Sequence, residues 1–440
     1  MNKTIAFKYS PYWNAKNKLY KLNDLAFQGE WAMKNSNVIK ELIMPTDTME
    51  DPNNPKKEYL WERYKSSALY TNYPAKYLKQ AIGLATKEKF VLELPDSMKK
   101  LEDYATVENL SLQAVEIEIL ESIIKFGSAL ILTKILDEVN VGTETPKIEI
   151  IPGCDVLDAE SVYDKVSGLD VFKRIVYYIQ EYEFDENTNS YSLPQIYIYV
   201  KAIDGEGKYY EAKMKEEHYS TFNFKNPLSS KDQCVELSYP KWLNELTFIP
   251  AVYVNKDNLK LDWKESPIQN LIDTSLSIFQ MTADMRFLMH QQSSSTLLIT
   301  GTDLDQKGIR TGVGSVINLI DPGSSGQYIA PSVAGLQAMQ NCLSEQHQLA
   351  QADLLTLTDA GAGSSGAALT LRMNDKTSEL IGIVSIIGKA IQRELEIIAY
   401  IMNEDIDKVI FTPYIGFGLI TNDETTEDVD KITNEEQINK

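Results

Sequence analysis

The sequence predicts an α+β protein in which helical and strand-rich stretches follow one another in long blocks. Two patterns support this class. Apolar residues recur every three or four positions in some stretches, and short β-branched and aromatic runs separated by turn residues fill others. Helices do not alternate with the strands, which disfavours a doubly wound parallel sheet. The 440 residues are 43% apolar and 24% charged, so the chain is globular in composition and long enough for several compact parts.

The first part of the chain, residues 1–127, is expected to be rich in α-helix. Residues 59–86 have a helical pattern with breaks expected near Tyr73-Pro74 and near Gly83. A second helix is predicted over residues 112–126, where apolar residues are spaced by three and four. Gly127 is well placed to end this helix, because glycine readily adopts the left-handed conformation that follows many helices.

Residues 128–265 are predicted to form a β-rich module. The runs SALILTKIL, KIEII and QIYIYVKA are short, rich in β-branched and aromatic residues, and separated by turn-forming residues. Since no long helices connect these runs, antiparallel hairpins and meanders are expected.

A long helix is predicted to follow this module over residues 266–293. Ser266 is a candidate N-cap, with Pro267 at the first helical position and Gln269 at the third, which is the arrangement of a capping box. At 1.5 Å per residue such a helix is a rod of about 40 Å.

A second long helix is predicted over residues 333–358, after a strand- and glycine-rich insertion at 294–332. Its apolar residues recur every seven positions and glutamines occupy other positions, so it should pack on one side only. Two antiparallel members of an ordinary helix bundle are the alternative. Bundle connections usually take about 2–8 residues, however, and this insertion is much longer.

Three further segments complete the chain. Small residues predict a loop over 359–376, and periodic apolar residues predict a helix over 377–403. The remaining residues, 404–440, form an acidic tail that is expected to be mobile or weakly helical.

The net charge of the chain indicates how it can interact with DNA. It has 43 basic and 63 acidic residues, a net charge of −20, and no block rich in Lys or Arg. Tight, salt-sensitive DNA binding needs a basic face and is therefore not expected, whereas weak sliding contact is compatible with this charge. Three widely spaced cysteines favour neither a disulfide framework nor a zinc site. A secretory signal and a membrane-spanning stretch are also not expected.

The sequence lacks the common motifs of catalytic sites. GAGSSGAALT lacks the lysine of a phosphate-binding loop, and no GxSxG nucleophile elbow occurs. The histidines, His218, His290 and His347, are isolated in sequence. We therefore expect no enzyme activity, no cofactor and no metal. A hydrolase site around Cys154 and Asp155 is a disfavoured alternative.

Taken in order, these blocks resemble the portal proteins of tailed bacteriophages. FIPAVYVNKDN followed by SPIQNLIDTSLSIFQMTADMRFLMHQQSSSTLLITG is similar to the family's Ile-Pro strand, first stem helix and strand entering the clip. SSGAALTLRMND is similar to the Ser-Gly-x-Ala-Leu segment at the tunnel loop. Further upstream, WERYKSSALY and IIKFGSALILT resemble the wing region. The resemblance covers roughly residues 59–400.

The resemblance implies a portal-like subunit with an α/β wing, two long stem helices, a small β-containing clip and a short C-terminal crown or tail. The implied parts are the wing at 1–265 (α-rich 1–127, β-rich 128–265), the stem helices at 266–293 and 333–358, the clip at 294–332, the tunnel loop at 359–376, a wing or crown-proximal helix at 377–403, and the crown or acidic tail at 404–440.

The resemblance also implies a function. Portal subunits form a ring, commonly a dodecamer, at one capsid vertex, through which double-stranded DNA passes during terminase-driven packaging and ejection. Implied partners are the terminase large subunit, the major capsid and scaffolding proteins, and head-completion or adaptor proteins, with assembly in the host bacterial cytoplasm and no membrane. A non-enzymatic helical scaffold or adaptor that forms no ring is the alternative.

Two groups of residues are implied as contact sites. The DNA-facing group is the tunnel loop, comprising Asp359, Gly361, Gly363, Ser364, Ser365, Gly366 and Arg372. The group that would dock terminase and adaptor proteins is in the clip, comprising Asp303, Asp305, Lys307 and Arg310.

Overall fold

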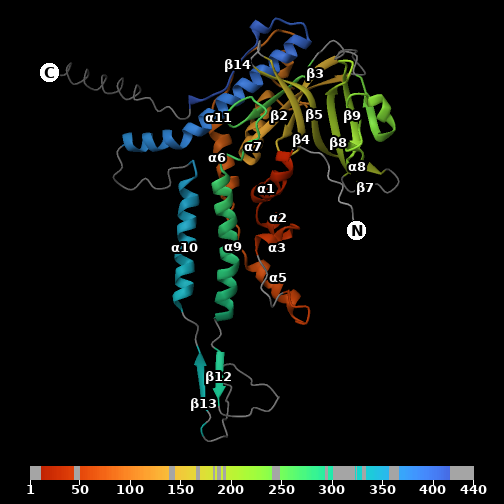
Figure 1. The fold of residues 1–440 in the computed structure, drawn as a ribbon. Coiled ribbons are helices and arrows are strands. Elements are labelled where there is room, and N and C mark those ends of the chain that lie inside the picture. Colours follow the sequence, from red (N-terminus) through yellow and green to blue (C-terminus); the bar gives the residue numbers. More distant parts are fainter. Residues whose placement is uncertain are drawn as a thin grey trace, which may run out of the picture. The chain divides into compact units, whose positions relative to one another are not determined.

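The computed structural model combines helices with antiparallel strands, as the sequence predicts (Figure 1). The chain divides into two compact units, each described by itself. Unit one comprises Met1–Phe27, Pro74–Asn270 and Asp353–Lys440, and unit two comprises Gln28–Tyr73 and Leu271–Ala352. The structure describes residues 11–43, 50–137, 144–164, 169–181, 184–185, 190–191, 195–239, 248–292, 296–300, 323, 325–329, 333–355 and 366–416.

The helices confirm that the first part of the chain is rich in α-helix. Those lying wholly or mostly in unit one are α1 (Pro11–Gln28), α6 (Tyr73–Ala85), η1 (Lys99–Leu101), α7 (Leu112–Phe126), α8 (Glu216–Tyr219), η2 (Pro227–Gln233), α11 (Gly366–Ile401) and η4 (Ile406–Lys408). Those of unit two are α2 (Glu30–Asn35), α3 (Ile39–Leu42), α5 (Lys57–Ser67), α9 (Gln269–Gln292) and α10 (Val333–Ala352). No described helix has an apolar stretch long enough to cross a bilayer.

The predicted antiparallel β-module is confirmed. A five-stranded sheet has the order β10-β9-β8-β5-β4, and a three-stranded sheet has the order β11-β2-β3. Their strands are β2 (Ser128–Asp137), β3 (Glu144–Pro152), β4 (Val156–Asp164), β5 (Leu169–Glu181), β8 (Gln195–Ile203), β9 (Tyr209–Lys215), β10 (Cys234–Ser238) and β11 (Ala251–Asn255). The two-stranded pairs are β1 (Val91–Glu93) with β14 (Ile410–Thr412), β6 (Phe184–Asp185) with β7 (Ser190–Tyr191), and β12 (Thr296–Thr300) with β13 (Ser325–Ile329).

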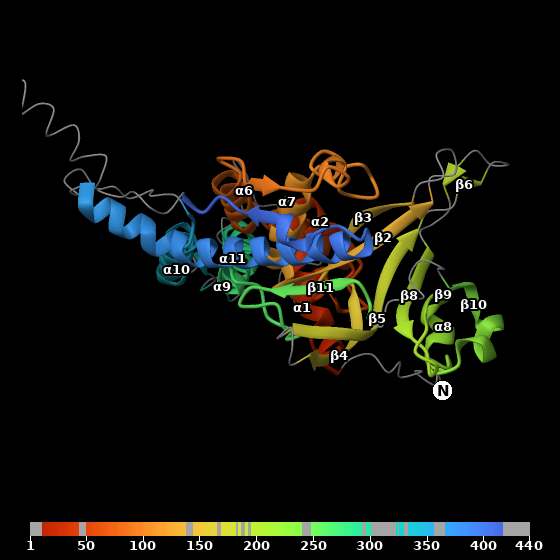
Figure 2. The same ribbon diagram turned by 90° about the horizontal axis from the view of Figure 1, so that it is seen from above.

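Strand β2 is buried on both of its faces. Leu130 and Leu132 belong to a core cluster shared with the five-stranded sheet. Ile131 and Thr133 are also buried, and they point the other way because side chains alternate along a strand. That second face packs against α7 and α11, which lie over the three-stranded sheet (Figure 2). Double burial explains why SALILT is almost continuously apolar.

The five-stranded sheet also packs on both faces. On β5, Tyr177 belongs to the core shared with the three-stranded sheet, while its neighbour Val176 belongs to a second core on the opposite face. On the paired strand β8, Tyr199 and Val200 alternate in the same way. Tyr177 and Tyr199 stand opposite each other, and their rings stack with centroids 5.8 Å apart. Unit one therefore has a layer of helices, two sheets, and a further covering of the five-stranded sheet that includes Tyr20 of α1 and Tyr219 of α8.

Helix α7 ends where the sequence predicts. The Ser111 side chain accepts a hydrogen bond from the Ala114 amide at the first turn. At the other end Gly127 has φ 82°, and its amide donates to the carbonyl of Ile123. A Cβ atom added at Gly127 would lie 2.2 Å from the Lys264 carbonyl oxygen. Glycine is therefore required here both by the left-handed conformation and by the approach of another backbone segment.

Ser266 occupies the turn before α9, but the predicted capping box is wrong. Its hydroxyl donates to the carbonyl of Ile124 and accepts from the Ile268 amide, and α9 begins at Gln269. The Gln269 side chain does not return to Ser266. It forms reciprocal amide hydrogen bonds of 2.9 and 3.2 Å with Asn23 of α1, so a contact distant in sequence replaces the local one.

Three other boundaries differ from the sequence-based predictions. Helix α6 continues through Gly83, an exposed position where a single glycine costs the helix only about 1 kcal/mol. Helix α10 ends at Ala352 rather than at residue 358, and the Leu355 amide donates to the Gln80 side chain instead of to a helical carbonyl. Helix α11 begins at Gly366, so residues 366–376, expected in a loop, are helical because Ala and Leu favour helix there.

A buried carboxylate lies where α11 packs against β2. Glu394 is fully buried and accepts a hydrogen bond from the hydroxyl of Thr133. Two positively charged side chains act on the Glu394 carboxyl group: Lys201 of β8, and Arg393, which precedes Glu394 in α11. Both favour the ionised form of the carboxyl group. Burial outweighs them and raises the pKa of Glu394 to about 7. The carboxyl group is therefore largely neutral in slightly acidic solution.

Replacing Gly127 by Ala should lower the free energy of unfolding by about 2 kcal/mol or more, because the left-handed conformation and the contact with Lys264 both oppose a side chain. Urea denaturation followed by circular dichroism measures this. Gly83→Ala is the matched control, since an added Cβ there meets no atom within 4 Å, and it should stabilise by about 0.5–1 kcal/mol. Equal effects of the two substitutions would contradict the role given to Gly127.

Glu394→Gln should change how stability depends on pH. The raised pKa means that the native state holds a proton that the unfolded state releases, so the carboxyl group destabilises the protein as pH rises from about 4.5 to about 7. The full effect is about 3 kcal/mol. Relative to the native sequence, the Gln variant should gain stability between pH 5 and pH 8. A difference in unfolding free energy that is independent of pH would refute the neutral carboxyl group.

Candidate functional site

Unit two carries a hairpin at the end of two long helices (Figure 1). Helix α9 has 24 residues and α10 has 20, so they are about 36 and 30 Å long. Between them in sequence, β12 pairs with β13 in an antiparallel ladder that runs from Thr296–Ile329 to Thr300–Ser325. Of the three strand runs predicted in the insertion, TLLITG and QYIA are therefore confirmed, and SVINLI lies outside the described residues. The pair of helices and the hairpin form the candidate site.

The segment that contains α5 and the residues after it contacts the middle of helix α9. The Tyr64 hydroxyl donates to Asp284, and burial together with this carboxylate raises the pKa of Tyr64. The Leu69 amide lies 3.1 Å from the Thr282 hydroxyl, which in turn lies 3.0 Å from the Leu69 carbonyl. The ring of Phe279, fully buried, meets Tyr70 edge-on. These contacts anchor α9 to the segment that precedes unit one's α6 in sequence.

Helix α10 presents an almost uncharged surface. Glu345 is the one Asp, Glu, Lys or Arg in its sequence. Leu343 and Ala350 are buried seven residues apart, which confirms the predicted one-sided packing. The exposed positions carry mainly amide and small side chains: Gln337, Ala338, Gln340, Asn341, Cys342, Ser344, Gln348 and Gln351. Glu345 and Leu349 are also exposed, so this face is mainly polar and carries little charge.

His347 is a packing residue of α10. Its Nδ1 lies 2.8 Å from the Tyr73 hydroxyl, and the two rings meet edge-on. Burial lowers the pKa of His347, so the neutral ring is favoured. His347 therefore packs α10 against Tyr73.

Most of the contact residues implied by the resemblance lie outside the described residues. This holds for Asp359, Gly361, Gly363, Ser364 and Ser365 of the tunnel loop and for Asp303, Asp305, Lys307 and Arg310 of the clip. Gly366 is the first residue of α11, and Arg372 lies further along the same helix. The structure thus gives the helices and strands that border the two segments.

The alternative hydrolase site near Cys154 gains no support. Burial and the neighbouring Asp155 raise the pKa of the Cys154 thiol, which disfavours the thiolate that a cysteine nucleophile needs. Burial also raises the pKa of Asp155 to about 6. Within the described part of the chain, no three His, Cys, Asp or Glu residues are grouped to hold a metal ion.

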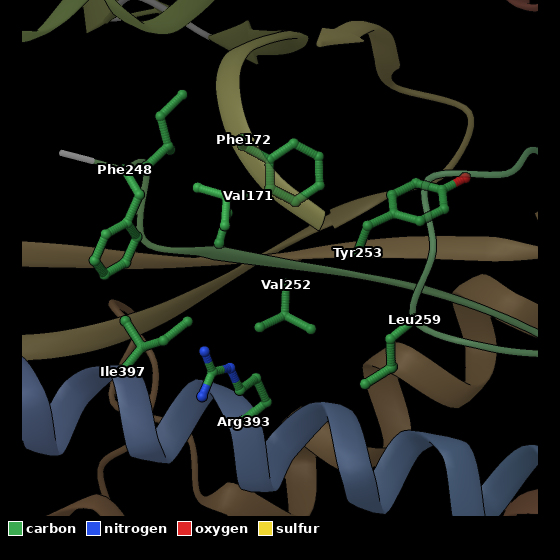
Figure 3. A pocket seen from close by; sticks show the side chains of 10 residues that line it. Val171, Phe172, Phe248, Val252, Tyr253, Leu259, Arg393 and Ile397 are labelled. Atoms are coloured by element: carbon green, nitrogen blue, oxygen red, sulfur yellow. The ribbon is translucent and has the colours of Figure 1, made fainter. Parts of the chain in front are cut away.

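A small cavity lies between β5, β11 and α11 (Figure 3). Phe172 and Tyr253 line it from the strands, and Arg393 and Ile397 line it from α11. Its volume is about 40 Å³, which accommodates a few water molecules and no organic substrate. Arg393 pairs with Glu396 at 3.0 Å. This cavity is a gap in packing between the sheet and α11, and we assign it no function.

The anchoring of α9 was missed by the sequence analysis. Thr282 falls on the apolar face of α9 between Phe279 and Phe287, and a hydroxyl at such a position is a signal that it has a partner. That partner, Leu69, is 213 residues away in sequence. The sequence pattern around Thr282 therefore indicates that its hydroxyl has a hydrogen-bond partner, but it does not identify Leu69 as that partner.

Thr282→Val should remove both hydrogen bonds to Leu69 while keeping the shape of the side chain. The expected loss is about 1–2 kcal/mol, because a partly buried amide and carbonyl lose their partner. The Leu69 amide should exchange with solvent faster in hydrogen-exchange mass spectrometry. Thr274→Val on the same helix is the control, since Thr274 has no hydrogen bond from its side chain among the described residues. Unchanged exchange in Thr282→Val would contradict the anchor.

Comparison with known proteins adds one finding on this segment. Residues 267–402 match a family model described as Domain of unknown function (DUF4055). The match covers somewhat under a third of the chain, from the turn before α9 through the hairpin and α10 to the end of α11. No curated protein matches the sequence. The candidate site thus lies within a segment similar to a recognised domain family whose function is unknown.

Proposed function

We propose that this chain is a portal subunit that forms a ring at one vertex of a bacteriophage capsid. The ring would conduct genome DNA during terminase-driven packaging and during ejection. It would also dock head-completion and tail proteins and would be retained in the virion. This proposal rests on the resemblance of the sequence and on the arrangement of α9, the hairpin and α10.

The observation that carries the proposal is the hairpin between two long helices. An ordinary bundle joins neighbouring helices by about 2–8 residues. Here, 40 residues separate Gln292 from Val333, and they include a five-residue antiparallel ladder. A projecting module of this kind suits a docking site for terminase and adaptor proteins, and we place the clip residues Asp303, Asp305, Lys307 and Arg310 in that role.

The family match supports treating this segment as one functional part. Its limits, residues 267 and 402, coincide closely with the start of α9 and the end of α11. The segment therefore includes α9 and α10, which would be the stem helices, the hairpin, the small-residue segment and α11, which packs on β2. The wing-like sheets lie before it in the chain.

Electrostatics support a conduit rather than a DNA-binding protein. A tunnel that DNA traverses in both directions has to avoid tight phosphate contacts, which a basic surface would provide. The net charge of −20 and the neutral amide face of α10 both fit weak contact. In this proposal the small-residue segment between α10 and α11 faces the DNA, because glycine, alanine and serine permit a close approach.

The ring is tested by the native mass of the purified chain. Twelve copies of the 49.8 kDa chain give about 598 kDa, and a closed ring is the symmetric assembly expected of a head-to-tail interface. Mass photometry should show a species near this mass, and negative-stain images of the same sample should show a central hole. The ring should form no stable complex with DNA even at low salt, because the chain has no block rich in Lys or Arg.

A monodisperse monomer or dimer at every concentration would contradict self-assembly of the ring and favour the scaffold alternative. Co-expression with the major capsid protein then decides between the two. Rings that appear only in its presence would retain the portal proposal, while a stable binary complex without rings would replace it.

A further inference from the structure

A cavity of about 300 Å³ is lined by residues of unit one. Its walls come from the loop around η1, from β3, and from the residue that follows α11. The lining residues are Ser97, Met98, Lys100, Leu101, Tyr104, Asn109, Pro146, Lys147 and Met402. Ser97, Lys100, Tyr104 and Asn109 of the lining are exposed, so the space is a pocket that opens to solvent.

Hydrogen bonds within the protein connect the segments that form the walls. The Ser97 hydroxyl donates to Glu404 at 2.7 Å, which fixes the η1 loop to the end of α11. The Ile148 amide donates to the Ala105 carbonyl at 2.8 Å, which fixes the same loop to β3. The Asn109 residue at the rim has φ 62°, so a tight turn closes the loop. The cavity is therefore formed in advance of any ligand.

The chemistry of the lining is apolar with two positive charges. Met98 and Leu101 are buried, and they supply apolar surface together with Pro146 and Met402. Lys147 is only 9% exposed, and its ammonium group donates to the Tyr104 carbonyl at 2.6 Å. Lys100 is the second charged residue of the lining. None of the lining residues is acidic, although the chain as a whole has a net charge of −20.

We propose that this cavity binds a small amphiphilic carboxylate, with the apolar body between Met98, Leu101 and Met402 and the carboxylate beside Lys100 and Lys147. A carboxylate is favoured because Lys100 and Lys147 are both lining residues, and lysine offers charge-assisted hydrogen bonds to a carboxylate. The volume lies at the lower end for organic ligands, which favours a single short chain or ring. The site is independent of the proposed ring.

Octanoate is a suitable probe, with octylamine as its counterpart of opposite charge and similar length. Isothermal titration calorimetry of the full chain should give a Kd on the order of 100 μM for octanoate, given the efficiency of ligands of this size. Octylamine should bind at least about tenfold more weakly, because the two lysines repel it. Met402→Trp should abolish octanoate binding by filling the cavity.

Lys100→Met and Lys147→Met should each weaken octanoate binding by about tenfold or more, since each removes one charge and keeps the alkyl chain. Lys99→Met is the matched control. Lys99 lies beside Lys100 on η1, is exposed, pairs with Asp96, and does not line the cavity. It should leave binding unchanged. Lys100 is also exposed, so its variant should fold even if Lys147→Met does not.

Three results would overturn the proposal. The first is no measurable octanoate binding to the native chain. The second is equal binding of octanoate and octylamine, which would mean that the apolar body alone is recognised. The third is octanoate binding that survives Met402→Trp or that falls equally in the Lys99 and Lys100 variants, which would place the ligand elsewhere on the surface.

Discussion

The fold of unit one depends on burying strand β2 on both faces. Leu130 and Leu132 face the five-stranded sheet, while Ile131 and Thr133 face the helices. One strand thus joins three layers, and the hydrogen bond from Thr133 to Glu394 fixes where α11 lies on it. Because α11 also belongs to the segment with the family match, this packing links the β-module to the part of the chain proposed to form the conduit.

Unit two contains two long helices, α9 and α10, and its stability depends on contacts between these helices and other segments. Helix α9 obtains its support from Tyr64, Leu69 and Tyr70 of the preceding segment, through hydrogen bonds and edge-on ring contacts. Helix α10 buries a narrow seam and leaves an amide-rich surface. A neutral surface of this kind can pass a highly charged polymer or contact another copy of the chain without strong electrostatic attraction.

Local signals in the sequence predicted local structure well. Gly127 marks the end of α7 because the left-handed conformation requires glycine, and the long insertion between α9 and α10 was visible as strand runs. Contacts between distant residues were not predictable. The pairing of Gln269 with Asn23 displaced the expected capping box, and the contact of Leu355 with Gln80 accompanies an early end of α10. Nothing in the sequence pattern indicated the cavity beside Lys147, since its lining comes from three separate segments.

The central claim is that the segment between α10 and α11 borders a DNA channel in a closed ring. An electron cryo-microscopy reconstruction of the assembled chain tests this most directly, because it gives the radial position of residues 356–365. The account predicts that this segment lines the central hole, with α9 and α10 around the channel and the hairpin at one end of the ring. A ring with this segment on its outer surface, or with the hairpin buried between subunits, would contradict the claim.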